Sequence, residues 1–317
     1  MDYNRRKFIK GMAIAAATIP FSKISAFEMS DNKISKYPIS FFTKPMDHFE
    51  PDFIAETLSL SGVEGFDLTV RPGGIVEPAN VENDLPKIIE AGMRHNVMTK
   101  MIVTSIQDTT ERHAKKTLKV ASENGVNHYR LGYYDYDFKK GILKSLAEVK
   151  PKLERLAQLN RDLNIQGGYQ NHSGIRVGAP MWDLWQLIHD ISPKLISNQF
   201  DVRHAVTEGN ASWILSMNLL SGNIGSLAIK DFVWEVSNGK ARVVGTPLGE
   251  GIVDFDLYFK TIKDLNIIAP ITLHIEYPLL SVDEKNLTLL QKQKIIVEKI
   301  KKDVDFIRFN FNKYEII

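Results

Sequence analysis

Tyr169-Gln170-Asn171-His172 lies where a short apolar β-run ends. Three further stretches repeat the pattern of polar and ionisable side chains directly after an apolar run: Phe200-Asp201-Val202-Arg203-His204, Ile229-Lys230-Asp231-Phe232 and His274-Ile275-Glu276-Tyr277. Polar groups at the carboxyl ends of several strands, with helices between the strands, are how an (α/β) barrel builds a site. The pattern therefore predicts a barrel with a polar cluster at one end.

Short apolar runs alternate with longer amphipathic runs along the chain, which predicts eight strand–helix pairs, the number in a single-domain α/β (β/α)8 TIM barrel. The predicted strands are Ile39–Phe42, Gly65–Val70, Met98–Thr104, His128–Leu131, Ile165–Tyr169, Leu195–Phe200, Ser226–Ile229 and Ile271–Ile275. The predicted helices are Asp52–Ser61, Val81–Asn96, Thr109–Asn124, Lys139–Leu163, Met181–Ile191, Ala211–Leu220, Asp254–Leu265 and Glu284–Lys301.

One segment falls outside this alternation. Phe232–Val244 carries Ser237-Asn238-Gly239 in its middle, and Asn-Gly is a strong signal for a tight hairpin turn. We therefore predict a β-hairpin inserted after the seventh strand, over the mouth of the barrel.

The N-terminus is set apart from the barrel. Asn4-Arg5-Arg6-Lys7-Phe8-Ile9-Lys10 precedes the apolar stretch Gly11–Phe21 and a small-residue site that ends at Ala26. This order predicts a twin-arginine signal peptide over residues 1–26, followed by the barrel over residues 27–317. The apolar stretch is too short to span a bilayer, so we expect no stable membrane span after cleavage. The expected destination is the periplasm.

Charge and composition narrow the class of protein. The predicted signal holds five basic residues and one acidic residue, so its removal changes the formal net charge from +2 to −2. A nearly neutral barrel without a dense run of Lys and Arg argues against nucleic acid as the partner. The chain has no cysteine, which excludes disulfides, thiolate ligands and a thiol nucleophile. Assembly into a homo-oligomer stays open.

The chain resembles the xylose-isomerase-like barrels, which include sugar phosphate isomerases, ketose epimerases and endonuclease IV. The resemblance covers nearly all of residues 27–317. The stretches that carry it are Gly65-Phe66-Asp67-Leu68-Thr69-Val70-Arg71-Pro72-Gly73-Gly74, Asn171-His172, Phe200-Asp201, Ile229-Lys230-Asp231-Phe232, and Pro247-Leu248-Gly249-Glu250-Gly251 before Val253-Asp254-Phe255. It implies a sugar or keto-sugar substrate and proton transfer next to a carbonyl.

The resemblance also implies a divalent metal ion, Mn²⁺, Mg²⁺, Zn²⁺ or Co²⁺, held by Glu, Asp, His and Glu after strands five to eight. The matching positions here are Gln170, Asp201, Ala228 and Glu276, so two of the four ligands have changed. A neutral amide weakens a cation site, and alanine supplies no ligand. An imidazole of His172, His204 or His274 can replace the missing one, and with His204 in that place the expected ligands are Gln170, Asp201, Glu276 and His204.

The changed ligands bear on the reaction. Ketose epimerases of this family use two glutamates as bases, and Gln170 cannot accept a proton in that way. Glu276 stays a candidate base on one face, with His172, His204 or Lys230 on the other, Lys230 only if burial lowers its pKa. A salt bridge from Lys230 to Asp201 or Glu276 is the alternative for that residue. One remaining base fits a lyase better than a strict epimerase, so a 3-keto-glycoside lyase or hydrolase is an alternative.

Substrate contacts are expected from residues near strand ends. We expect them from Arg71, Asn171, Trp234 and Glu250, with the Trp234 ring as a platform for a sugar ring. Arg71 and Arg130 can bind hydroxyls or a carboxylate, or can pair with Asp67 or Asp135. A non-catalytic sugar-binding barrel is the second alternative. An endonuclease is disfavoured because the additional ligands of a multi-metal site are missing.

Overall fold

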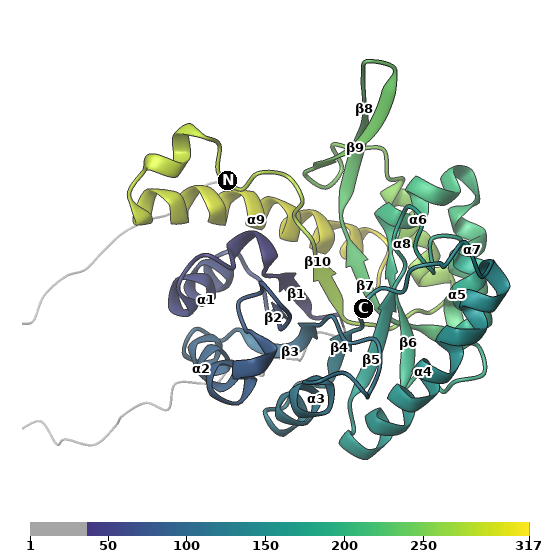
Figure 1. The fold of residues 1–317 in the computed structure, drawn as a ribbon. Coiled ribbons are helices and arrows are strands. Elements are labelled where there is room, and N and C mark those ends of the chain that lie inside the picture. Colours follow the sequence, from purple (N-terminus) through teal and green to yellow (C-terminus); the bar gives the residue numbers. More distant parts are fainter. Residues whose placement is uncertain (1–36, 317) are drawn as a thin grey trace, which may run out of the picture. The chain divides into compact units, whose positions relative to one another are not determined.

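A computed structural model describes residues 37–316, and the predicted signal peptide lies outside these residues. Eight parallel strands close into a barrel in the order β1-β10-β7-β6-β5-β4-β3-β2, which confirms the predicted TIM barrel (Figure 1). The barrel strands are β1 (Ile39–Phe42), β2 (Gly65–Thr69), β3 (Met98–Val103), β4 (His128–Arg130), β5 (Gln166–Gln170), β6 (Ile196–Asp201), β7 (Ile224–Ile229) and β10 (Ile271–Leu273).

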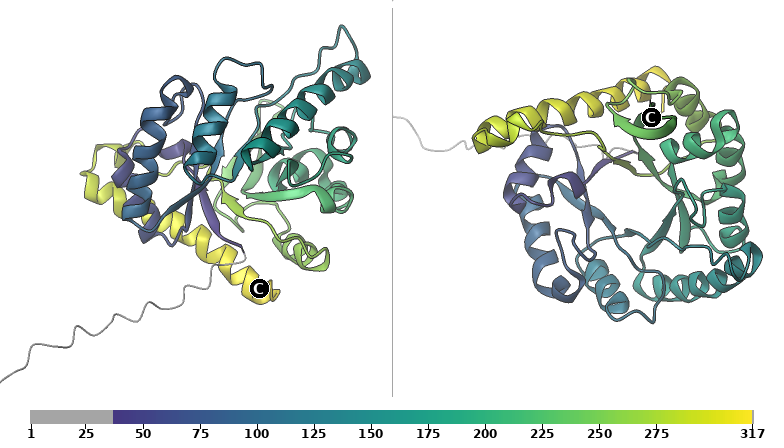
Figure 2. Two further views of the ribbon diagram at one scale, coloured as in Figure 1. Left: turned by 90° about the horizontal axis from the view of Figure 1, so that it is seen from below. Right: turned by 45° about the horizontal axis from the view of Figure 1, so that its top comes forward.

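Helices surround the strands as an outer ring, seen end-on in the right-hand view of Figure 2. They are α1 (Pro51–Leu60), α2 (Val81–Arg94), α3 (Ala114–Glu123), α4 (Ile142–Leu163), α5 (Met181–Ile188), α6 (Val202–Gly209), α7 (Trp213–Leu220), α8 (Phe255–Asp264) and α9 (Leu289–Lys313). Within residues 37–316, no helix combines the length and the apolar character that crossing a bilayer requires.

The core lies between the ring and the barrel wall, and α2 shows how it forms. Its buried residues recur at helical spacing and pack towards the strands. Gly92 lies on this face because an added Cβ would meet the Val97 carbonyl oxygen at 2.4 Å and the Phe66 ring at 2.6 Å. Close packing of helix on strand therefore requires glycine at this position.

The predicted hairpin is present and longer than expected. Strands β8 (Asp231–Ser237) and β9 (Lys240–Thr246) pair antiparallel and project from the barrel (Figure 1). Asn238 and Gly239 form the two-residue turn with φ of 51° and 70°, the positive values of a type I′ turn. The base of the hairpin lies against the loop that follows β10. A Cβ added to Gly245 would lie 2.7 Å from the Glu276 carbonyl oxygen.

Two helix predictions differ from the structure. The predicted helix Ala211–Leu220 is present as α7, but the polar stretch after β6 also forms a helix, α6, which begins at Val202 and was not predicted. Asp201 starts α6 as its N-cap, accepting a hydrogen bond from the His204 backbone N–H at 3.0 Å. At the other end of the chain, α9 begins at Leu289 instead of Glu284, because Thr288 forms a capping box with Gln291.

Candidate active site

Four predicted site residues meet at the carboxyl end of the barrel. Gln170 ends β5, Asp201 ends β6, Lys230 follows β7, and Glu276 follows β10. Gln170, Asp201 and Lys230 are almost completely buried, whereas Glu276 remains partly exposed. The parallel strands bring the four side chains together because their carboxyl ends share one rim of the barrel.

Lys230 lies at the centre of this cluster. Its Nζ is 3.0 Å from Asp201 Oδ2 and 2.8 Å from Glu276 Oε1, so one ammonium group joins both carboxylates. The His204 Nε2 atom lies 3.1 Å from the same nitrogen. The salt-bridge alternative for Lys230 is thereby confirmed; Asp201 and His204 both come from the end of β6 and the start of α6, whereas Glu276 follows β10.

The first turn of α6 completes the network with Arg203 and His204. Arg203 Nη1 lies 3.1 Å from Glu276 Oε2, and its Nη2 lies 3.2 Å from His204 Nε2. The other ring nitrogen of His204 lies 2.8 Å from Ser173 Oγ. Because protein groups contact both ring nitrogens, His204 is a buried positioning residue. Burial and the charges of Lys230 and Arg203 hold the pKa of His204 well below its usual value.

The charges of this network fix the ionisation of its carboxylates. Burial alone would raise the pKa of Glu276, but the Lys230 and Arg203 charges outweigh burial and lower that pKa to about 2. The same two cations lower the pKa of Asp201 against the effect of its burial. A carboxylate with such a low pKa accepts a proton poorly, so the predicted role of Glu276 as a base is disfavoured by its surroundings.

Gln170 has a fixed amide orientation. Arg130 Nη1 donates to Gln170 Oε1 at 3.0 Å, and the Tyr133 hydroxyl donates to the same oxygen. The Gln170 amide nitrogen donates to Asp201 Oδ2 at 2.7 Å. Since a guanidinium only donates and a carboxylate only accepts, the amide oxygen faces Arg130 and the amide nitrogen faces Asp201.

These contacts decide whether the site fits a divalent cation. The Gln170 oxygen faces away from Asp201, and the Lys230 ammonium lies where a cation would join Asp201 to Glu276. Over residues 37–316, no group of three or more His, Asp or Glu side chains is arranged to hold a metal ion. The expected ligands Gln170, Asp201, Glu276 and His204 therefore do not fit the metal ion that the resemblance implies.

His172 has an available ring nitrogen and is partly exposed, whereas the Nε2 of His274, which has no hydrogen-bond partner among residues 37–316, is buried. Its Nδ1 lies 2.8 Å from the Ser173 carbonyl oxygen, which can only accept, so the ring proton lies on Nδ1. Nε2 therefore carries a lone pair, and no hydrogen-bond partner for it is found in the described part of the chain. The ring is partly exposed and packs against His204, with 4.0 Å between ring centroids. Burial, helped by the charges of Lys230 and Arg176, lowers the pKa of His172.

Of the four predicted substrate contacts, Asn171 and Arg71 lie at the barrel mouth, whereas Trp234 and Glu250 lie farther out. Asn171 is buried and bridges two strand ends, since its Nδ2 donates to the Asp201 carbonyl and its Oδ1 accepts from the Asp201 N–H. Arg71 lies near the mouth above the Phe42 ring. Trp234 lies on the projecting hairpin, packed edge-on against Phe232. Glu250 pairs with Lys302 of α9 at the surface, so we leave it out of the site.

The Lys230-Asp231 motif has a second, structural function. Asp231 accepts backbone hydrogen bonds from Gly249 at 3.0 Å, Gly251 at 2.8 Å and Val253 at 3.2 Å. A Cβ on Gly251 would lie 2.2 Å from the Asp231 carboxylate, so glycine allows the loop to close around it. This loop orders the chain beyond the hairpin and explains why the Pro247–Gly251 stretch accompanies Ile229–Phe232.

Three residues outside the predicted site also belong to it. Arg203 pairs with Glu276, Tyr133 donates to Gln170, and Arg176 lies over the Tyr133 ring. Arg203 lies inside a stretch singled out from the sequence, so its position there was an available signal. Tyr133 and Arg176 lie in the loops after β4 and β5, where no local pattern separates a site residue from a surface residue.

One cleft has a volume of about 560 Å³ and is lined in part by Tyr277, the residue after Glu276. Its lining includes Pro45, Phe49, Tyr277, Leu279 and Leu280, and excludes Gln170, Asp201 and Lys230. The volume is that of a small-molecule pocket, with aromatic and aliphatic walls.

Comparison with solved structures supports the fold. A xylose isomerase domain protein from Planctomyces limnophilus has a TM-score of 0.63 at 15% identity, covering 89% of this chain and 99% of its own. D-allulose 3-epimerase from Methylomonas sp. gives 0.64 at 13% identity, covering 86% and 98%. The probable 3-DHS dehydratase AsbF from Bacillus anthracis gives 0.62 at 14% identity, covering 85% and 98%. No curated protein matches the sequence.

The family comparison agrees with the structural likeness. The profile described as xylose isomerase-like TIM barrel matches residues 88–306, which is more than half of the chain. The matched segment runs from α2 into α9 and includes the ends of β5, β6, β7 and β10. The chain belongs to the xylose isomerase-like TIM barrel family.

Proposed function

We propose that this barrel is an enzyme that moves a proton next to the carbonyl of a sugar or keto-sugar, an isomerase- or epimerase-type reaction. The observation that carries the proposal is His172, whose Nε2 lone pair is available beside a buried network of charges. A neutral imidazole with an unoccupied nitrogen is a suitable general base at neutral pH. Family membership and the neighbouring sugar epimerases support the reaction class.

The surroundings of His172 keep its ring neutral and favour a negatively charged product beside it. Burial first, and then the charges of Lys230 and Arg176, lower the pKa of His172. The same positive potential would stabilise an enolate formed beside it. His204, Arg203 and Glu276 hold Lys230 in place, so we assign them positioning roles. The proposal contains no metal-dependent step, because the residues present do not fit a cation.

The geometry of Gln170 favours a second reaction that also begins by removing a proton next to a carbonyl. Its amide is held between Arg130 and Asp201 and cannot return a proton on the opposite face. A single base suffices for elimination, in which His172 removes the proton next to the carbonyl and a group on the neighbouring carbon leaves. A 3-keto-glycoside lyase or hydrolase is therefore the alternative reaction, with the glycosidic oxygen as the leaving atom.

Proton exchange distinguishes these reactions. The barrel, residues 27–317, is incubated in D2O with keto-sugars and 3-keto-glycosides, and NMR follows the proton next to each carbonyl. Exchange with intact substrate or a rearranged sugar supports an isomerase or epimerase, and exchange with release of the glycosidic group supports a lyase. Binding without exchange would overturn the proposal in favour of a sugar-binding barrel. His172→Gln should abolish exchange, whereas exposed His189→Gln should retain it.

We also propose export to the periplasm by the twin-arginine route. The support is the order of Asn4–Lys10, Gly11–Phe21 and Ala26 in the sequence. Replacing Arg5 and Arg6 by Lys keeps the charge and removes the arginine pair. This change should retain the full-length precursor in the cytoplasm, and unchanged export would reject the twin-arginine route.

A further inference from the structure

Three arginines gather on one side of the barrel mouth, around two aromatic rings. The guanidinium groups of Arg130 and Arg176 lie 5.0 Å and 4.8 Å from the centroid of the Tyr133 ring. Those of Arg71 and Arg130 each lie 5.7 Å from the centroid of Phe42, the last residue of β1. We call Arg71, Arg130 and Arg176 the arginine cluster. Its members come from loops or strand ends after β2, β4 and β5.

None of the three forms an ion pair among residues 37–316, although Asp47 and Asp67 act on Arg71 from a distance. The Asp47 carboxylate accepts hydrogen bonds from Thr43 at 2.9 Å and Thr69 at 2.7 Å. Asp67 accepts one from Thr272 at 2.7 Å. The alternative pairings of Arg71 and Arg130 with Asp67 or Asp135 are therefore not formed.

The cluster is held under electrostatic strain. Arg130 is 6% exposed, its buried Nε has no hydrogen-bond partner among residues 37–316, and it bonds instead to the neutral Gln170. Burial, followed by repulsion from Arg130, lowers the pKa of Arg71. Contacts with aromatic faces offset only part of the cost of like charges brought together. A bound anion would remove the repulsion and supply the missing acceptors.

We propose that the substrate carries a carboxylate, as in a uronic or keto-aldonic acid, and that the arginine cluster binds this group. The inference rests on the proposed function, because both use the same barrel mouth. A carboxylate suits the cluster because its two oxygens accept paired N–H bonds from a planar guanidinium.

The arginine cluster and the proposed base share a neighbour. The Tyr133 ring lies over two of the arginines and contacts His172 edge-on, with 4.8 Å between ring centroids. A carboxylate bound by the cluster would hold the adjoining carbon chain near His172 Nε2. Binding energy from a group that does not react would thereby orient the carbon that loses its proton.

Titration calorimetry compares D-glucuronate, D-galacturonate and 2-keto-D-gluconate with D-glucose, D-galactose and D-fructose. We expect at least one acid to bind about tenfold to a hundredfold more tightly than its neutral counterpart, the effect of one charge-assisted hydrogen bond. Arg71→Gln and Arg176→Gln should each remove about tenfold of that preference. These two side chains are partly exposed, so both variants should fold, as circular dichroism can check.

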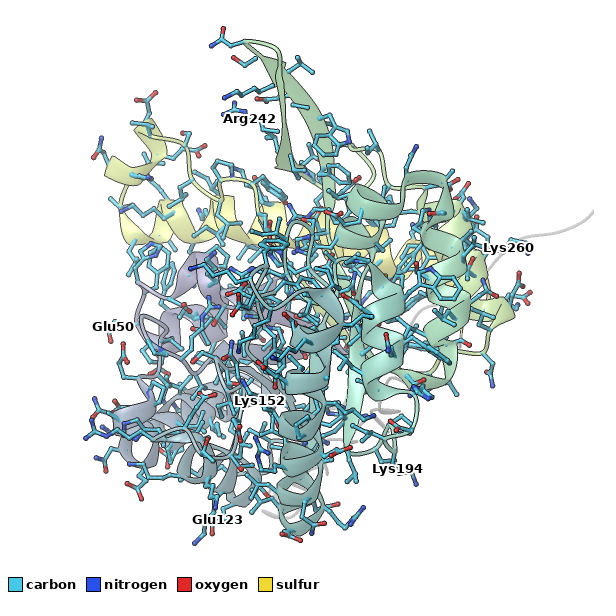
Figure 3. All side chains as sticks on the ribbon, turned by 45° about the vertical axis from the view of Figure 1, so that its right-hand side comes forward. Glu50, Glu123, Lys152, Lys194, Arg242 and Lys260 are labelled. Atoms are coloured by element: carbon cyan, nitrogen blue, oxygen red, sulfur yellow. The ribbon has the colours of Figure 1, made fainter. Side chains whose placement is uncertain are left out.

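Arg242→Gln is the matched control. Arg242 lies on the projecting hairpin, away from the barrel mouth, and pairs with Glu235 (Figure 3). The Arg242→Gln variant should keep the same preference for acids over neutral sugars. Equal affinity for acids and neutral sugars, no binding of any acid, or unchanged preference in both cluster variants would overturn the inference. Tighter binding of glucose 6-phosphate or galactose 6-sulfate would assign the cluster to a tetrahedral anion and overturn the carboxylate.

The test separates this inference from the proposed function. Acids that bind through the cluster without proton exchange would support the inference and reject the enzyme. Proton exchange on neutral keto-sugars, without tighter binding of acids, would support the enzyme and reject the carboxylate inference.

Discussion

Lys230 Nζ lies 3.0 Å from Asp201 Oδ2, and both side chains are buried at the carboxyl end of the barrel. This ion pair stands where the resemblance places a divalent cation. A lysine ammonium carries one positive charge and reaches two carboxylates, so it neutralises part of their repulsion without a metal ion. The neutral Gln170 amide removes a further negative charge from the same place.

Replacing Lys230 by Met should lower the free energy of unfolding by about 3–5 kcal/mol, because it leaves buried Asp201 without its cation. Urea denaturation at pH 7 measures the loss. Lys260→Met is the control, since Lys260 pairs with Asp264 on the exposed face of α8 (Figure 3), where a loss of at most about 1 kcal/mol is expected. Equal losses of unfolding free energy in the two variants would contradict the prediction that Lys230→Met leaves a buried, unpaired charge on Asp201.

Chelation should leave the protein unchanged. We expect elemental analysis to find no stoichiometric cation, and we expect the same Tm before and after treatment with EDTA. Adding Mn²⁺, Mg²⁺, Zn²⁺ or Co²⁺ should not raise the Tm, because a ligand that binds the folded state would stabilise it. One tightly held cation per chain, lost on chelation together with stability, would show that Lys230 and Gln170 move to admit a metal ion.

Gln170→Glu should destabilise the barrel at pH 7 by about 1–3 kcal/mol, because the repulsion between the new carboxylate and Asp201 in a buried site outweighs its attraction to Arg130. Like-charge repulsion raises the pKa of the new carboxyl, so the destabilisation is largest above that pKa and fades as pH falls through it. Denaturation at pH 7 and pH 5 measures both effects.

Gln158→Glu is the matched control for this substitution. Gln158 also donates to an aspartate, Asp162, but on the exposed face of α4. Solvent screening should keep its effect below about 1 kcal/mol. A Gln170→Glu protein that gains stability from Mn²⁺ would instead support the expected metal site.

The pH dependence of catalysis should follow His172. Its pKa is lowered, so kcat/KM should rise with pH through a value below the 6.5 of an ordinary histidine and stay level at neutral pH. His172→Gln should lower kcat/KM by about 10²–10⁴-fold and remove this acid limb. His189 also contacts a backbone carbonyl through Nδ1 but is exposed, and His189→Gln should retain the profile. An acid limb that persists in His172→Gln would assign the base elsewhere.

Glu276 should contribute stability that depends on pH. Its pKa is about 2 in the folded protein against an ordinary 4.5, so its ion pairs stabilise the fold fully above about pH 4.5. The stabilisation is lost as pH falls towards 2. Because Glu276 is partly exposed, we expect about 1–2 kcal/mol after solvent screening. The stability difference between wild type and Glu276→Gln should therefore shrink from pH 6 to pH 3, and a constant difference would contradict the shift.

Much of the fold could be predicted from local sequence. The eight strands and most helices follow from periodic apolar residues, and the hairpin follows from Asn238-Gly239. The start of α6 could not be placed in this way, because an Asp after a strand fits both a loop and an N-cap. The hydrogen bond from the His204 backbone to Asp201 decides between them, and it exists only once the helix has formed.

The sequence also predicts which residues form the site, but it does not predict what each residue does there. Gln170, Asp201, Lys230 and Glu276 were placed at one rim because parallel strand ends converge there. Charge pairing in the site depends on distances between side chains that are far apart in sequence. Lys230 is 26 residues from His204 and 46 residues from Glu276. No local pattern encodes such distances.

The barrel, its family and the rim on which polar side chains gather follow from the amino-acid sequence, because periodicity and strand-end chemistry are local properties of the chain. The contacts between strands show that Lys230 joins Asp201 to Glu276, that the Gln170 oxygen faces Arg130, and that His172 keeps an available nitrogen. The tertiary structure also brings Arg71, Arg130 and Arg176 around Phe42 and Tyr133. The physical reason is that charge pairing and burial are set by neighbours in space, and closure of the barrel selects those neighbours.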